Sequence, residues 1–117
     1  MKNQPLFRRL GYSLAGLMAA LRSENSFKFH VVAACGVLAA LVWWRPQPVW
    51  WAVVLLTIVT VLAAELMNTA IEHLADHLHP DQHPRIKVVK DCAAAAVLIA
   101  SLGALAVGAT LLFELFG

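Results

Sequence analysis

One apolar segment of this chain ends in four polar residues that share a helical spacing. They are Glu65, Asn68, Glu72 and Asp76, in the run ELMNTAIEHLAD. An α-helix turns by about 100° per residue, so all four side chains fall on one helical face over roughly 16 Å. Carboxylates aligned in this way suit the binding of a hard cation and the removal of a proton from a hydroxyl.

Two hypotheses about chemistry follow from these residue types. Carboxylates that lie at the same depth in the membrane, with no basic residue beside them in sequence, repel one another unless a cation joins them. Oxygen ligands of this kind suit Mg²⁺ held with the phosphates of a nucleotide. Lys90 would then neutralise phosphate charge, because phosphoryl transfer depends on positioning and charge compensation. No GxxxxGK[ST] segment is present, which excludes a P-loop enzyme. Glu65 lies deeper in the apolar segment and suits the role of general base.

The rest of the sequence predicts a membrane protein. Of its 117 residues, 61% are hydrophobic and 14% are charged, and the mean hydropathy of +0.72 lies outside the range of an ordinary soluble domain. Three apolar runs are separated by charged segments. We expect three membrane spans, because the first two runs reach across a bilayer once flanking polar residues are included. The predicted spans cover about residues 27–45, 48–75 and 88–114.

The basic residues predict the orientation of these spans. Five of them precede the first apolar run and three lie between the second and third spans, whereas only Arg45 lies between the first and second. The positive-inside rule therefore places the N-terminus and the 77–90 loop in the cytoplasm and the C-terminus outside. We expect the first span to stay in the mature protein, because no small-residue cleavage site of a signal peptide follows it.

Two further segments give a scale of depth. Apolar residues recur at helical spacing over about residues 5–23, which predicts an amphipathic helix on the cytoplasmic surface, packed on the bundle or lying in the interface. Four tryptophans flank a Pro-rich turn near residues 45–48 and mark the outer aromatic belt. At about 1.5 Å per residue from this belt, Glu24 and Glu72 reach one inner level, and Glu65 lies about 10 Å deeper. Asp91 reaches the same level when it is counted from Phe113, near the outer end of the third span.

Other interpretations of the same residues remain open. Glu65 can be paired or protonated within a helical bundle, Asp76 and Asp91 can solvate helix ends, and Glu24 can be an interfacial charge. A proton-coupled transporter using Glu65 is the alternative function, which is disfavoured because the acidic residues other than Glu114 cluster in the cytoplasmic half.

A zinc site is a further alternative. Four histidines lie close in sequence, with the first two four residues apart: His73, His77, His79 and His83. This spacing is compatible with a transition metal. The carboxylates, and not the imidazoles, form the aligned stripe, so zinc is the lesser hypothesis.

The polar stripe is part of a longer motif: Glu, two residues, Asn, Ser or Thr, a small residue, an aliphatic residue, Glu, two residues, Val, Asp. The sequence matches it from Glu65 to Asp76, except that Ala75 stands in place of valine. Further matches are the Lys90-Asp91 pair, the AAAAVLIA that follows, the GYS of the N-terminal helix, Glu24 and Phe27. Together these segments resemble the prokaryotic diacylglycerol kinases, small integral-membrane lipid kinases that include the undecaprenol kinases. The resemblance covers essentially the whole chain.

The resemblance implies an all-α homotrimer in the bacterial inner membrane. Each protomer would be one domain over residues 1–117, with a surface helix and three membrane helices, and the active sites would lie between neighbouring protomers. The reaction would move the γ-phosphate of ATP, with Mg²⁺ as cofactor, to the hydroxyl of a membrane lipid. We expect no nucleic-acid partner.

The same resemblance implies roles for individual residues. Glu65 would be the general base, in a catalytic set with Asn68 and Asp76. Glu24 and Glu72 would bind Mg²⁺. The residues expected around ATP are Tyr12, Glu24, Glu72, His83, Lys90 and Asp91, and those expected near the acceptor are Ser13, Phe27 and His30. The sequence departs from the diacylglycerol enzymes at Pro5, which occupies the place of an arginine that Arg8 or Arg9 would replace.

The acceptor lipid is either diacylglycerol or undecaprenol. The segment NSFKFHVVAAC, which contains His30, and the stretch NTAIEH resemble the undecaprenol kinases, whereas the Phe-Gly ending resembles the diacylglycerol enzymes. These features favour undecaprenol slightly. The product would feed undecaprenyl-phosphate recycling or phospholipid metabolism.

Overall fold

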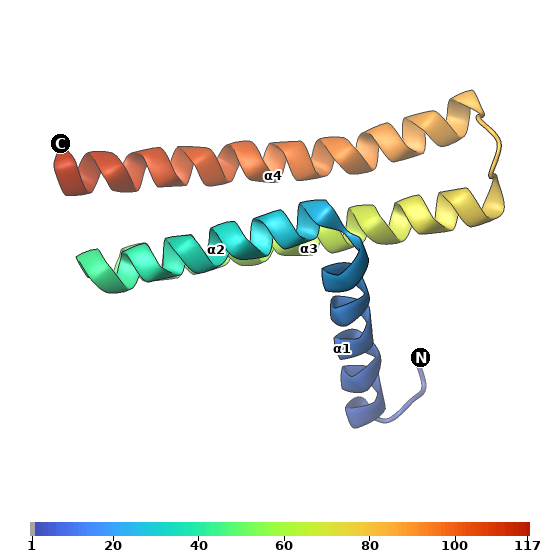
Figure 1. The fold of residues 1–117 in the computed structure, drawn as a ribbon, viewed down its shortest axis with the longest axis horizontal. Coiled ribbons are helices and arrows are strands. Elements are labelled where there is room, and N and C mark those ends of the chain that lie inside the picture. The colour runs from blue at the N-terminus through green and yellow to red at the C-terminus, as the bar shows by residue number, and fades with distance from the viewer. Residues whose placement is uncertain (1) are drawn as a thin grey trace.

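A computed structural model describes residues 2–117, which form four α-helices joined by short connections (Figure 1). Three of the helices are long and apolar enough to cross a membrane: α2 (Asn25–Trp44), α3 (Pro48–Leu78) and α4 (Pro84–Phe116). The remaining helix, α1 (Leu6–Ser23), precedes them. The predicted all-α architecture with three candidate spans is confirmed.

The helices α3 and α4 form a long antiparallel pair, and α2 packs on α3. Figure 1 shows α1 running across the direction of the other three helices, and α1 contacts both α2 and α3 near the bend that joins it to α2. The C-terminus lies at the same end of the bundle as the connection between α2 and α3 (Figure 1). Helix α3 is therefore the central element, which contacts all three others.

Two breaks in helical backbone set the positions of the helices. Glu24 has extended backbone angles (φ −106°, ψ 109°), so it ends α1 and starts α2 at a sharp bend. Arg45 adopts left-handed angles (φ 50°, ψ 58°) at the end of α2, and its N–H donates to the carbonyl of Leu41 at 2.8 Å. The prolines that follow Arg45 cannot continue α2, and Pro48 instead occupies the first turn of α3. The expected tight turn beside the tryptophans is therefore present.

The connection between α3 and α4 is shorter than the sequence predicts. The two prolines of the segment 77–87 suggest an irregular loop throughout, but α3 continues through Leu78 and α4 begins at Pro84. Pro84 is compatible with the first turn of a helix because that position needs no N–H donor. The side chain of His83 accepts a hydrogen bond from the backbone N–H of Arg85 at 3.1 Å and caps the helix.

Contacts at both ends of the bundle agree with the depth count from the tryptophan belt. At the end with the connection between α2 and α3, the rings of Trp44 and Phe116 meet edge to face with centroids 5.6 Å apart. At the opposite end, Glu24 contacts His73, and Asp76 forms an ion pair with Lys90. Side chains from the α1–α2 bend, α3 and α4 therefore make contacts near the level predicted for the acidic residues.

The buried core of the single chain is small. Phe27 and Leu41 of α2 are its largest fully buried side chains, whereas large apolar residues on every helix are exposed. An apolar surface of this extent faces lipid or other protein segments when the helices cross a membrane.

Candidate active site

The polar stripe of α3 faces the neighbouring helices. The buried positions of α3 are Val54, Val61, Glu65 and Ala75. Asn68 falls on the same face, because this spacing follows the helical period. Glu65 is 4% exposed, and it is the one buried polar side chain among residues 2–117. Glu65 therefore points towards the neighbouring helices, on the same face of α3 as the buried apolar side chains.

Helix α2 provides the partner of Glu65. The Nδ1 atom of His30 lies 2.7 Å from Oε1 of Glu65, although the imidazole N–H is not aligned for a hydrogen bond. One turn earlier, Phe27 is 2% exposed. Both residues were predicted near the acceptor lipid, and the structure places His30 in direct contact with the predicted general base.

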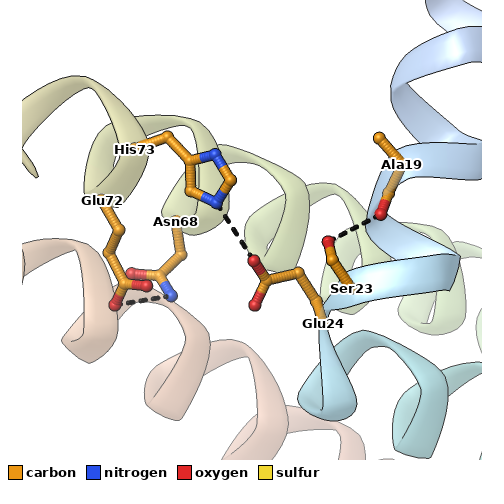
Figure 2. Close-up of polar contacts among 6 residues, drawn as sticks. All are labelled: Ala19, Ser23, Glu24, Asn68, Glu72 and His73. Carbon is orange, nitrogen blue, oxygen red and sulfur yellow. Dashed lines mark hydrogen bonds and ion pairs between the residues drawn. The ribbon is translucent and has the colours of Figure 1, made fainter. Parts of the chain in front are cut away.

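One turn further along α3 from Glu65, α3 and the bend between α1 and α2 contribute a second polar group, shown in Figure 2. The amide of Asn68 donates to Oε1 of Glu72 at 3.5 Å, and the carbonyl oxygen of Asn68 is buried without a partner. Glu24, at the bend between α1 and α2, lies 3.2 Å from Nε2 of His73. In the view of Figure 2, the amide of Asn68 is drawn between the Glu24 and Glu72 carboxylates.

These oxygen atoms match the ligands that Mg²⁺ prefers, carboxylate and amide oxygens. Among residues 2–117, however, no three acidic, histidine or cysteine side chains gather closely enough to enclose a metal ion. Glu24, Glu72 and Asn68 thus offer oxygen atoms of the type that suits Mg²⁺, and among the described residues no hydrogen bond or ion pair joins Glu24 to the other two. The four histidines of the zinc hypothesis are divided, since His73 faces Glu24 while His79 and His83 meet in the loop.

A third polar group surrounds a cavity at the end of the α3–α4 pair where the connecting loop lies. The cavity has a volume of about 580 Å³ and lies between the α3–α4 loop and the first turns of α4. Its lining includes three residues that were predicted around ATP, which are His83, Lys90 and Asp91.

Ion pairs hold the charged side chains at this cavity. Lys90 pairs with Asp76 across the two helices. Lys87 pairs with Asp91 at 2.6 Å within α4. The structure therefore brings Asp76 into contact with one of the cavity residues.

The residues predicted on α1 do not join these groups within the single chain. Ser13 donates to the carbonyl of Arg9 at 3.0 Å, and Tyr12 is 45% exposed. Arg8 donates to the side chain of Gln4 at 3.4 Å. Among the contacts described for residues 2–117, none links these side chains to the stripe of α3.

Sequence analysis missed the basic partners of the acidic residues. Spacing alone could have paired Lys87 with Asp91, which are four apart on one helix. The depth count could have suggested His73 for Glu24, because it places Glu24 level with the neighbouring Glu72. The contact between His30 and Glu65 had no such signal, since it depends on how α2 is rotated about its axis.

Comparison with known proteins places this arrangement in a family. Residues 11–112 match the family described as prokaryotic diacylglycerol kinase. The chain belongs to this family. It is therefore a lipid kinase and a multi-pass membrane protein, and the resemblance seen in the polar motif is confirmed.

Individual relatives cover most of the kinase. Undecaprenol kinase from Bacillus subtilis is 36% identical over 93 residues, which are 80% of this chain and 76% of the relative. Diacylglycerol kinase from Escherichia coli is 30% identical over 112 residues, 96% of this chain and 92% of the relative. A diacylglycerol kinase from Synechocystis is 35% identical over 102 residues, and the match spans 58% of that longer protein. The chain thus matches relatives named undecaprenol kinase as well as relatives named diacylglycerol kinase.

Proposed function

We propose that this kinase transfers the γ-phosphate of Mg-ATP to the hydroxyl of a membrane lipid along the polar stripe of α3. The observation that carries the proposal is the separation of polar groups by depth. Glu65 is buried among apolar side chains, whereas Glu72 lies two turns nearer the cytoplasm and the cavity beside Lys90 lies at the end of the bundle. A lipid hydroxyl and a water-soluble nucleotide can approach one helix from these two levels.

The nucleotide would bind towards the cavity between the α3–α4 loop and α4. Lys90 and His83 line it and can donate hydrogen bonds to phosphate oxygens. Lys90 is paired with Asp76, so Asp76 orients the ammonium group before the nucleotide binds. Asp91 is held by Lys87 at the same place. The apolar lining residues Pro80 and Ile86 can contact the nucleotide base.

Glu24 and Glu72 would hold Mg²⁺, with the buried carbonyl oxygen of Asn68 available beside Glu72. The ion supplies compensation of phosphate charge when it is bound. The protein holds one carboxylate at the α1–α2 bend and the other on α3, at similar depth in the bundle. The bend at Glu24 and its contact with His73 do this for the first carboxylate, and the amide of Asn68 does it for the second.

Glu65 would act as the general base. It takes the proton of the lipid hydroxyl while that oxygen forms a bond to the γ-phosphorus, and the bond from this phosphorus to the bridging oxygen breaks, so that ADP leaves. The burial of Glu65 suits this role because a carboxylate with few water molecules around it interacts more strongly with the reacting hydroxyl.

A homotrimer with active sites shared between protomers would complete the site. Two features of the single chain support this proposal: Tyr12 and Ser13 stand apart from the stripe of α3, and large apolar side chains of α2 and α4 are exposed. Neighbouring protomers could cover part of that surface and bring α1 to the stripe. The charge distribution supports an inner-membrane location with the N-terminus and active site in the cytoplasm and the C-terminus outside.

We favour undecaprenol slightly over diacylglycerol as the acceptor. The reason is the segment around His30, which resembles the undecaprenol kinases, because His30 contacts the proposed general base. The test is to supply the purified protein with labelled ATP, Mg²⁺ and each lipid in separate detergent micelles. We expect labelled phosphate on a lipid, with the higher turnover on undecaprenol. Transfer to neither lipid would overturn the proposed function, and higher turnover on diacylglycerol would reverse the choice of acceptor.

A further inference from the structure

We propose that His30 is a positioning residue for Glu65, one that holds the carboxylate ready to take the proton of the acceptor. The inference rests on the proposed function and adds a second residue to its proton-transfer step. It starts from the close contact between Nδ1 of His30 and Oε1 of Glu65, which are 2.7 Å apart on two different helices.

The surroundings of this pair make a partner for Glu65 necessary. An ionised carboxylate in apolar surroundings is strongly unfavourable unless a charge or hydrogen-bond donor compensates it. Glu65 is 4% exposed, and His30 also borders an apolar cleft of about 110 Å³ between the three long helices. The side chains lining this cleft include Ala33, Val61 and Leu62. His30 is the one titratable residue in that lining.

The other three ion pairs of residues 2–117 have a different character, because each contains a well-exposed side chain. His73 and Lys87, the partners of Glu24 and Asp91, are 69% and 76% exposed. In the pair of Lys90 and Asp76, the aspartate side chain is 62% exposed. Exposed pairs of this kind contribute little, because water solvates either partner when the other is removed. Removing His30 would instead leave a buried carboxylate without compensation. Among these pairs, loss of the basic side chain should therefore disturb its acidic partner most in the pair of His30 and Glu65.

The geometry of the contact also leaves Glu65 able to react. His30 engages Oε1, and within the described residues the hydrogen bonds and ion pairs leave Oε2 without a partner. The imidazole is itself restrained, since the ring of Phe29 packs against it edge to face with centroids 5.5 Å apart. A carboxylate held through one oxygen by a restrained ring keeps a fixed orientation for its other oxygen.

In the transfer step, Oε2 of Glu65 takes the proton of the lipid hydroxyl while the lipid oxygen bonds to the γ-phosphorus and ADP leaves. His30 holds Oε1 throughout and does not touch the reacting atoms. Its side chain keeps the Glu65 carboxylate aimed at the hydroxyl during the step. Contacts with the nucleotide are made elsewhere, so His30 should affect turnover and not the binding of Mg-ATP.

Two substitutions of similar size distinguish this role from packing. In His30→Asn the amide nitrogen lies near the place of Nδ1 and can keep the contact with Glu65, whereas in His30→Gln it lies further out, near the place of Nε2. We expect kcat to fall by about tenfold or more in His30→Gln and His30→Ala, a loss typical of coupled neighbouring residues. His30→Asn should keep most of the wild-type kcat. All three should keep the wild-type KM for Mg-ATP.

His77→Asn is the matched control, because His77 lies exposed on α3 and is not part of the proposed site. It should keep the wild-type kcat. The yield and thermal unfolding of each variant in detergent show whether it folds. The decisive comparison is a higher kcat in His30→Asn than in His30→Gln, because both variants lack the imidazole ring.

The second measurement combines His30→Gln with Glu65→Gln, with residual rates followed by prolonged incubation with labelled ATP. If His30 acts through Glu65, the double variant should be no slower than Glu65→Gln. Losses that multiply in the double variant would overturn the inference, as would His30→Ala with the wild-type kcat or His30→Gln as active as His30→Asn. Each of these outcomes leaves an active wild-type kinase and the proposed function intact, whereas an inactive wild-type protein would overturn both.

Discussion

Lys90 of α4 forms an ion pair with Asp76 of α3 near the loop that connects the two helices. The contact joins a residue expected to bind phosphate to the last member of the polar stripe. It also links the cavity between the α3–α4 loop and α4 to the face that contains Glu65 and Glu72. The two helices thus join the cavity proposed for the nucleotide to the deeper residues proposed to meet the lipid.

Lys90→Ala should raise the KM for Mg-ATP by about tenfold or more, the effect of losing one charge-assisted hydrogen bond. The KM for the lipid should not change, because Lys90 lies at the other end of the stripe. Initial rates at varied Mg-ATP and saturating lipid provide the measurement. Arg85→Ala is a control from the first turn of the same helix, and an equal effect in that variant would show a general loss of positive charge and not a specific contact.

Glu72→Ala should increase the Mg²⁺ concentration needed for half-maximal activity, by about tenfold, because it removes one of two predicted carboxylate ligands. Asn68→Ala should act in the same direction, since it removes both the unpartnered oxygen and the hydrogen bond to Glu72. Titration of activity with Mg²⁺ at fixed ATP provides the measurement. Glu114→Gln, near the opposite end of α4, should leave the curve unchanged, and an unchanged curve for Glu72→Ala would remove the metal assignment.

Phe27→Ala and Leu41→Ala compare the two ends of α2, where both side chains are fully buried. Each should lower the free energy of unfolding, by about 3–5 kcal/mol for Phe27 and about 2–5 kcal/mol for Leu41. Unfolding in detergent checks this. If Phe27 also contacts the acceptor, only Phe27→Ala should raise the KM for the lipid. Equal effects of the two substitutions on that KM would assign Phe27 to the core alone.

Mixing two inactive variants tests whether protomers share the active site. Tyr12→Ala changes α1 and Glu65→Gln changes α3, and these side chains stand apart within one chain. If a site takes Tyr12 from one protomer and Glu65 from its neighbour, mixed trimers contain some sites with both native residues. Part of the wild-type rate should return when the variants are unfolded and refolded together. Activity no greater than the sum of the separate variants would contradict a shared site.

The fold and the depth of the site could be predicted from the sequence because both depend on lengths. The apolar runs fix the number of spans, and the rise per residue from the tryptophan belt places Glu24 level with Glu72. The contacts between Glu24 and His73, and between Asp76 and Lys90, agree with that count.

Partners across helices could not be predicted in the same way. Whether His30 or a neighbour faces Glu65 depends on the rotation of α2 about its own axis, which the packing of Phe27 and Leu41 fixes in three dimensions. The third span is predicted to begin near residue 88, whereas α4 begins at Pro84, because proline is compatible with the first turn of a helix. The roles of Tyr12 and Ser13 in the site remain predictions, since the partners expected for them belong to another protomer.

The most direct test of the central claim is the initial rate of phosphate transfer from labelled Mg-ATP to lipid by the wild-type kinase and by Glu65→Gln, with both substrates saturating. Glutamine keeps the size of the side chain and removes the base. The account predicts a wild-type enzyme that labels the lipid and a variant at least about 100-fold slower, the loss typical of a general base, with an unchanged KM for Mg-ATP. A Glu65→Gln protein that transfers phosphate at the wild-type rate would contradict it.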